Sequence, residues 1–154
     1  MNDQPPEYWM NQALELAKKA GSIGEVPIGA IVVKNGQIVG RGHNLREQSK
    51  DATRHAEMDA IKDACNTLGA WRLSGCDLYV TLEPCLMCSG AIYQARIDRV
   101  FYGASDPKAG AMGSLYQIHQ DLRLNHRLPA QGGLLAQECG QILKDFFQQR
   151  RNQV

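Results

Sequence analysis

The segment from Asp77 to Ala104 constrains the fold of this chain more than any other. It reads as a buried strand, "DLYVTLEP" (77–84), a helix, "CLMCSGAIYQAR" (85–96), and a second strand, "DRVFYGA" (98–104). A helix of this length between two strands predicts a parallel pair joined by a right-handed crossover. The chain is therefore expected to form a sheet with helices packed on it.

The flanking segments predict the rest of this sheet and its helices. Two apolar runs within 26–42 flank Asn35-Gly36, the preferred pair for a tight type I′ turn, and indicate a hairpin. Amphipathic helices are predicted over 7–20 and 133–151, with a short final strand over 124–129. A polar loop, 44–53, precedes a helix running from about His55 to Leu68, for which Asp51 and Thr53 are candidate N-caps. Together these elements predict an α/β fold, a three-layer α/β/α sandwich around a mixed sheet of about five strands.

Length and charge limit the partners that this chain can have. Its 154 residues suit one domain, 1–154, and a net charge of +1 leaves only a local patch to attract nucleic acid. No apolar run approaches the roughly 20 residues of a spanning helix. The first ten residues carry acids and prolines, unlike a signal peptide. We therefore expect a cytoplasmic protein with no membrane partner.

Cys85 and Cys88 have a spacing that metals use. Residues three apart lie about 60° apart around a helix, so two thiols can bind one ion. Pro84 favours the start of this helix, where the helix dipole lowers thiol pKa values and favours the thiolates that a metal requires. Five cysteines, an odd number, do not indicate a disulfide framework. The spacing alone fits a thioredoxin-like redox pair equally well.

His55 and Glu57 favour the metal interpretation. His55 lies at another predicted helix start, and such starts gather at one edge of a parallel α/β sheet. Three ligands with no fourth nearby indicate a catalytic zinc site, because structural sites have four. Glu57 would then be the carboxylate that moves protons. Residues i and i+2 point nearly opposite ways in mid-helix, so this assignment requires His55 to lie at the helix entrance.

The sequence resembles a known family. H-x-E paired with P-C-x-x-C is the signature of zinc-dependent nucleobase deaminases. Six segments, in order, resemble the bacterial tRNA-specific adenosine deaminases: "EVPIGAIVV", "HAEMDAI", "LYVTLEPCLMCSGAI", "GASDPKAGAMGS", "LNHR" and "DFFQQRR". The similarity covers nearly the whole chain. It implies a cytidine-deaminase-like fold and hydrolytic deamination of adenosine to inosine at the wobble position of a tRNA anticodon loop.

The resemblance also implies roles for matching residues. One Zn²⁺ per subunit would be held by His55, Cys85 and Cys88, with Glu57 as the catalytic proton shuttle. Asn44 matches a residue that contacts the nucleoside, and Asp106 and Lys108 match a loop that reaches the RNA around the target base. Members of the family form homodimers. The resemblance therefore implies a homodimer that binds a tRNA anticodon stem-loop. The sequence departs from the family at two positions near the metal motif: it has Ala52 where proline is usual and Arg54 where a small or apolar residue is usual. Neither position is a predicted zinc ligand, and Arg54 is expected to be a surface charge.

The basic residues that would contact RNA phosphates are the least specific part of this hypothesis. The candidates are Lys108, Lys144, Arg150 and Arg151. Basic residues at the end of a helix also complement its dipole and stay solvated, so Arg150 and Arg151 fit either role.

Two other functions remain open. A free nucleobase or nucleoside deaminase, acting on guanine or cytidine, would use the same zinc site and differ only in its loops and terminal helix. A zinc-binding or thiol redox module without deaminase activity would also explain the two cysteines.

Overall fold

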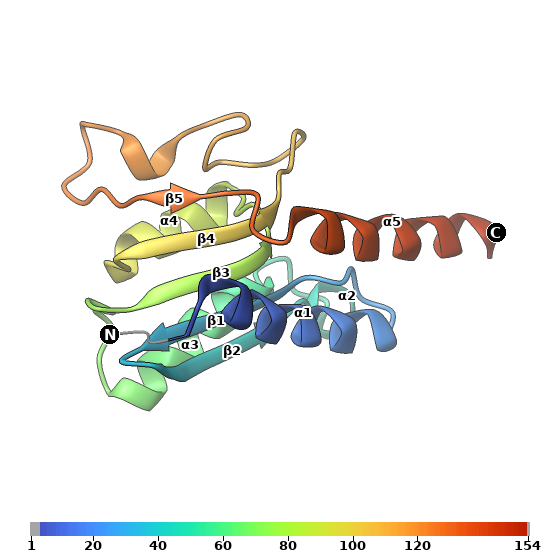
Figure 1. The fold of residues 1–154 in the computed structure, drawn as a ribbon, viewed down its shortest axis with the longest axis horizontal. Helices are drawn as coiled ribbons and strands as arrows, with labels where there is room; N and C mark the ends of the chain where they lie inside the picture. Colours follow the sequence, from blue (N-terminus) through green and yellow to red (C-terminus); the bar gives the residue numbers. More distant parts are fainter. Residues whose placement is uncertain (1–3, 154) are drawn as a thin grey trace.

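The computed structural model describes residues 4–153 as five strands and several helices (Figure 1). The elements in order are α1 (Pro6–Ser22), β1 (Gly29–Lys34), β2 (Gln37–His43), α2 (Arg46–Ser49), α3 (Ala56–Leu68), β3 (Asp77–Leu82), α4 (Leu86–Ala95), β4 (Arg99–Ala104), a 3₁₀ turn (Ile118–Gln120), β5 (Ala130–Gln131) and α5 (Ala136–Asn152). None of the helices in this described part is both long and apolar enough to span a membrane.

The strands form one mixed sheet in the order β2-β1-β3-β4-β5. β1 pairs antiparallel with β2 and β3, whereas β3 with β4 and β4 with β5 are parallel. The parallel pair predicted around helix 85–96 is therefore confirmed. The predicted hairpin is confirmed too, because Lys34 pairs with Gln37 across Asn35 and Gly36, whose φ values of 52° and 71° suit a type I′ turn.

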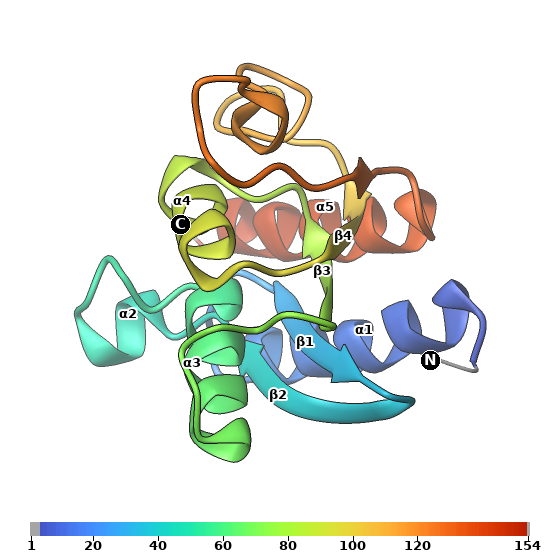
Figure 2. The same cartoon turned by 90° about the vertical axis from the view of Figure 1, so that its left-hand side faces the viewer.

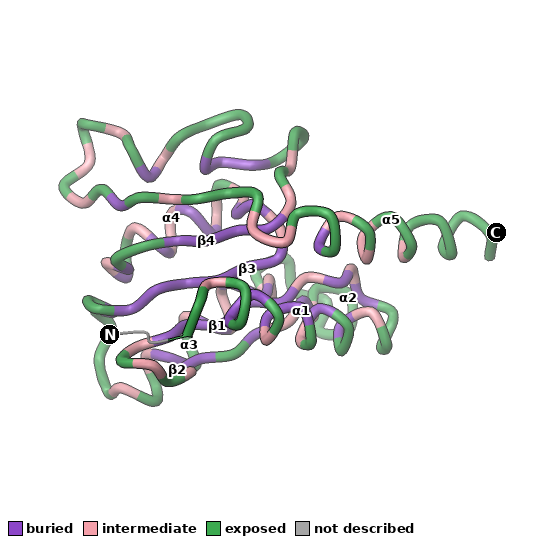
Figure 3. The backbone as a smooth tube through the Cα atoms, in the orientation of Figure 1, coloured by how far each residue is buried: buried purple, intermediate pink, exposed green. Residues whose placement is uncertain are grey.

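Helices cover both faces of the sheet, as a three-layer α/β/α sandwich requires (Figure 2). Alternate residues of a strand point to opposite faces. Val32 and Val80 join the cluster beneath α3 and α4, while Ile31 and Tyr79 pack with Trp9 of α1 on the other face. The central strands are buried, and the end of α5 extends past the sheet into solvent (Figures 1 and 3).

Small residues let α3 lie very close to β2. Ala56, Ala60 and Ala64 recur at four-residue spacing on one buried face of α3. They pack against Gly40 and Gly42, where an added Cβ would collide with the helix backbone. This close contact sets the height of the first residues of α3 above the sheet, and hence the position of His55 and Glu57.

Two local predictions are wrong, and each has a physical reason. The final strand is Ala130–Gln131, not 124–129, because residues before Pro129 turn back, with the Leu128 N–H bonded to the His119 carbonyl. The N-cap of α3 is His55, not Asp51 or Thr53, since the Asp51 carboxylate is already bonded to the N–H and hydroxyl of Thr53.

The short helix α2 lies inside the segment predicted to be a loop. The buried Glu25 carboxylate accepts the N–H groups of Glu47 and Gln48, which are first-turn amides of this helix. Such a contact between residues more than twenty positions apart supplies a cap that local sequence does not contain.

Candidate metal centre and active site

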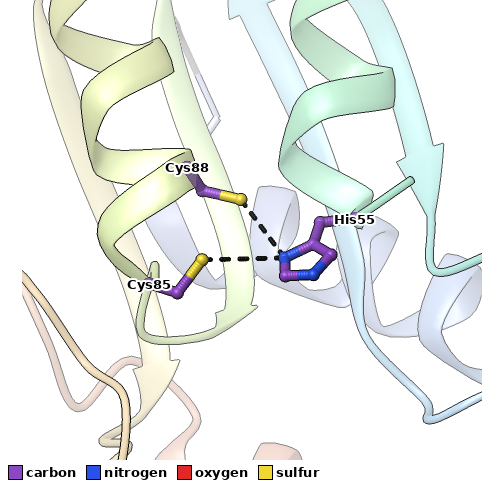
Figure 4. A group of neighbouring side chains, drawn as sticks. All are labelled: His55, Cys85 and Cys88. Carbon is purple, nitrogen blue, oxygen red and sulfur yellow. Dashed lines mark hydrogen bonds between the residues drawn. The ribbon is translucent and has the colours of Figure 1, made fainter. Parts of the chain in front are cut away.

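Two helix N-termini meet at the site, and each contributes its N-cap residue. His55 caps α3 and Cys85 caps α4, both with extended backbones. Their carbonyls accept the N–H groups of Asp59 and Ser89, at 3.1 and 2.8 Å. Cys88 lies in the first turn of α4, so its side chain reaches the same space (Figure 4). The requirement that His55 lie at the helix entrance is therefore met.

The three side chains are spaced as ligands of a single tetrahedral ion. His55 Nδ1 lies 3.7 Å from Cys85 Sγ and 3.5 Å from Cys88 Sγ (Figure 4). All three candidate ligand atoms lie within 4.8 Å of one another. Tetrahedral zinc with Zn–S of about 2.3 Å and Zn–N of about 2.1 Å separates nitrogen from sulfur by about 3.6 Å. The donor set fits zinc in both chemistry and spacing.

The two cysteines differ in proton affinity. Hydrogen bonds from Cys88 and His55 lower the pKa of Cys85 to about 4 against the opposing effect of burial. The hydrogen bond to Cys85, together with burial, raises the pKa of Cys88 well above its usual range. The hydrogen bond with Cys85 also raises the pKa of His55. Cys85 is therefore the more acidic thiol of the pair, and a bound dication would favour the second thiolate.

Glu57 lies two residues after His55, and its side chain lines the same cavity. It is 5% exposed, and burial raises the pKa of its carboxyl to about 7, with the Cys85 thiolate acting in the same direction. An acid with a pKa near the working pH can both accept and return a proton. Glu57 thus has the proton affinity expected of a general acid–base group.

His55, Glu57 and Cys85 open onto a cavity of about 260 Å³. Its lining residues come from the N-terminal ends of α2, α3 and α4, the end of β3, α5 and the connecting loops: Val26, Ile28, Asn44, Arg46, His55, Ala56, Glu57, Leu82, Glu83, Cys85, Asp106, Ala109 and Phe147. Two further predicted substrate residues, Asn44 and Asp106, therefore lie at the cavity together with His55, Glu57 and Cys85. Lys108 lies outside it.

Asn44 and Asp106 both brace the loops that carry them. The Asn44 amide donates to the Val26 carbonyl at 3.3 Å and accepts the Arg46 N–H at 3.1 Å. One Asp106 carboxylate oxygen accepts the N–H groups of Lys108 and Ala109. Each side chain keeps further hydrogen-bonding capacity for a ligand.

Lys108 lines a second, neighbouring groove of about 660 Å³ against α5. The other lining residues are Leu143, Lys144, Phe147, Gln148, Arg150 and Arg151. All four predicted phosphate contacts thus lie on this groove. Arg150 is already engaged, because its guanidinium donates to the Gly24 carbonyl at 3.1 Å and lies over the Phe146 ring. Phe147, 43% exposed, borders both the groove and the cavity.

Sequence reasoning did not assign four of the residues around the cavity. Arg46, Glu83 and Phe147 line it, whereas Glu25 is a buried carboxylate that caps α2, the helix that carries Arg46. The available signal was an acid inside an apolar run, as in "TLEPC", because an acid is almost never buried without a partner. Arg54, expected to be a surface charge, pairs with Asp59 at 3.0 Å.

Comparison with known proteins agrees with this fold and site. The profile of the MafB19-like deaminases matches residues 4–151, so the chain has the architecture of a deaminase. It is 50% identical to a tRNA-specific adenosine deaminase of Bacillus subtilis (strain 168) over 94% of this chain and 90% of that protein. A protein of the same description from Haemophilus influenzae is 47% identical over 96% of this chain and 86% of its own length. The chain belongs to the family of the tRNA-specific adenosine deaminases.

Two solved deaminase structures are similar to this chain to different extents. A structure from a study of A-to-I editing by tRNA:A34 deaminases at the wobble position of transfer RNA is 45% identical, with a TM-score of 0.85 over 88% of this chain and 99% of that one. A guanine deaminase from Bacillus subtilis is 44% identical, but with a TM-score of 0.63 over 66% of each chain. The similarity to the tRNA deaminase extends further along the chain.

Proposed function

We propose that this protein deaminates adenosine to inosine at the wobble position of a tRNA anticodon loop. One observation carries the proposal. His55, Cys85 and Glu57 line one cavity, and Cys88 completes the ligand cluster with His55 and Cys85, in a chain about half identical to proteins described as tRNA-specific adenosine deaminases. The long coverage of those relatives supports this choice over a free-base deaminase.

The proposed chemistry assigns a task to each group of residues. His55, Cys85 and Cys88 would hold Zn²⁺, which when bound supplies a water acidic enough to become a nucleophile near neutral pH. Glu57 takes a proton from that water and gives it to N1 of the adenine, which makes C6 electrophilic. The oxygen of that water would bond to C6, and Glu57 would then carry the remaining proton of this water to the amino group, so that the C6–N bond breaks, ammonia leaves and inosine remains.

The size of the cavity supports a single unstacked base as the reacting group. A volume of about 260 Å³ is below the range of about 300–1,000 Å³ typical of drug-sized ligands. A duplex cannot enter, so the base must leave its stack. A loop base is already largely unstacked, which lowers the cost of presenting it.

The groove against α5 supports contacts to the RNA outside the reacting base. Lys108, Lys144, Arg150 and Arg151 line it, and it adjoins the cavity at Phe147. We propose that phosphates of the anticodon stem-loop bind here, although the whole chain carries a net charge of only +1. The homodimer and the cytoplasmic location expected from the resemblance are part of this proposal, and light scattering would measure the former.

Incubation with four substrates tests the proposal. The protein would be mixed separately with an anticodon stem-loop, free adenosine, cytidine and guanine, and zinc would be measured on the same sample. We expect one zinc per subunit and release of ammonia from the stem-loop. Ammonia from guanine or cytidine without turnover of the stem-loop would favour the free-base alternative. Zinc without turnover of any substrate would favour a binding module, and a metal-free protein whose thiols cycle to a disulfide would favour a redox module.

A further inference from the structure

Glu83 is a buried acid in the wall between the candidate metal centre and the loop beside it. It follows β3, two residues before Cys85, and is 2% exposed. Its carboxylate accepts four hydrogen bonds, and all of them come from one stretch of chain. The donors are the N–H groups of Asp106, Met112 and Ser114, at 3.0, 3.1 and 3.0 Å, and the Ser114 hydroxyl.

The stretch 105–114 has little regular structure of its own. A single β-bridge joins Met112 to Gln117, the Ala111 N–H donates to the Pro84 carbonyl at 2.8 Å, and the other backbone bonds of the stretch are local. Hydrogen bonds to an ionised carboxylate are roughly twice as strong as neutral ones. Glu83 therefore supplies the strongest polar attachment that the structure gives to this stretch.

Gly110 shows how closely the stretch fits around the carboxylate. A Cβ added at Gly110 would collide with the carboxylate of Glu83. The backbone thus approaches the acid closely at Gly110 and bonds to it at Asp106 and Ser114, which flank Gly110 in the chain. The carboxylate occupies the centre of the folded loop rather than its edge.

We infer that Glu83 is a positioning residue that holds residues 106–109 as one wall of the substrate cavity. Asp106 and Ala109 line that cavity, and Lys108 lines the adjoining basic groove. Glu83 itself borders the cavity, but its carboxylate is engaged by the four donors of the loop, so we place its action through the loop. This inference rests on the proposed function for its effect on catalysis, but not for its effect on the loop.

The test compares Glu83→Gln with Asp77→Asn. Asp77 is a matched control, because it is a buried acid at the other end of the same strand, hydrogen-bonded to Arg99 at 3.0 and 2.6 Å. Amide hydrogen exchange at residues 106, 112 and 114 measures the loop in the full-length protein with zinc bound. Steady-state kinetics on the stem-loop measure KM and kcat separately, and zinc content is measured on each variant.

In Glu83→Gln we expect exchange at the three amides to accelerate about tenfold or more, with zinc retained. KM for the stem-loop should rise about tenfold while kcat changes less than about threefold, because the loop touches the substrate away from the reacting atoms. Asp77→Asn should change neither the three amides nor KM. Equal effects of the two variants on exchange and KM would overturn the inference.

Ser114→Ala keeps the test decisive if Glu83→Gln does not fold. It removes one donor to the same carboxylate and should move the same amides and KM in the same direction by a smaller factor, about threefold. Unchanged exchange in this variant would overturn the inference. Inactive wild-type protein would instead contradict the proposed function, and the exchange data would still decide whether Glu83 holds the loop.

Discussion

Replacing Glu57 by glutamine tests the proposed proton transfer with little change of shape. The side chain is 5% exposed, and glutamine fills the same volume, so the packing around α3 should survive. Glutamine cannot take a proton from water or return one. General acid–base catalysis contributes about 10²–10⁴-fold, so kcat should fall by that factor, or about 2.7–5.4 kcal/mol in activation free energy.

The same substitution should make the metal-free protein more stable. Burial raises the pKa of Glu57 from 4.5 to about 7, so the folded state holds this proton more tightly than the unfolded chain does. Stability from this group is present below about pH 4.5 and is lost as the pH rises through about 7. The loss reaches about 3 kcal/mol by pH 8, and a neutral glutamine avoids it.

Three measurements check this reasoning. Inosine formation gives the rate, metal analysis gives zinc per subunit, and urea denaturation of the metal-free protein at pH 8 gives stability. We expect lower activity, unchanged zinc and a higher urea midpoint. Loss of zinc in proportion to activity would show that Glu57 is a ligand, and an unchanged urea midpoint would show that its carboxyl does not have a raised pKa.

Three further predictions concern the metal, the basic groove and acid stability. Cys88→Ser should lose zinc and activity together, because a serine hydroxyl replaces the thiolate; metal analysis that still finds one zinc per subunit would contradict the proposed ligand set. Arg151→Ala should reduce the slope of log K against log salt for stem-loop binding by about 0.7, and Arg150→Ala by less, since its guanidinium already bonds to the backbone. If the slope does not change when Arg150 and Arg151 are both replaced by alanine, the two arginines are solvated charges at the end of the helix and do not contact the RNA. Burial lowers the pKa of His119, with Glu83 opposing it, so stability should fall as the pH drops below about 6.5. His119→Gln should flatten that fall in urea titrations between about pH 7 and 5, and an equally steep fall would refute the assignment.

The parts of the fold that were predicted correctly depend on local patterns. Asn35-Gly36 specifies its turn because both residues tolerate positive φ, and alternation along β3 specifies which side chains face each helix layer. The wrong predictions concern places where a contact outside the local pattern decides, either with a distant residue or with a competing neighbour. The capping of α2 depends on Glu25, more than twenty residues away, and Asp51 could not cap α3 because Thr53 had already engaged it.

The residues that can hold a metal and move a proton were determined by the sequence itself, because H-x-E and P-C-x-x-C place suitable donors at helix N-termini. Only the tertiary structure decided how those donors meet. Close packing of α3 on Gly40 and Gly42 brings His55 within 3.7 Å of both sulfurs. Likewise, Glu83 acquires its partners only when the loop folds around it. Hydrogen bonds and metal ligation require atoms within a few ångströms of one another. Residues 30 positions apart come that close only after the sheet and its helices have packed.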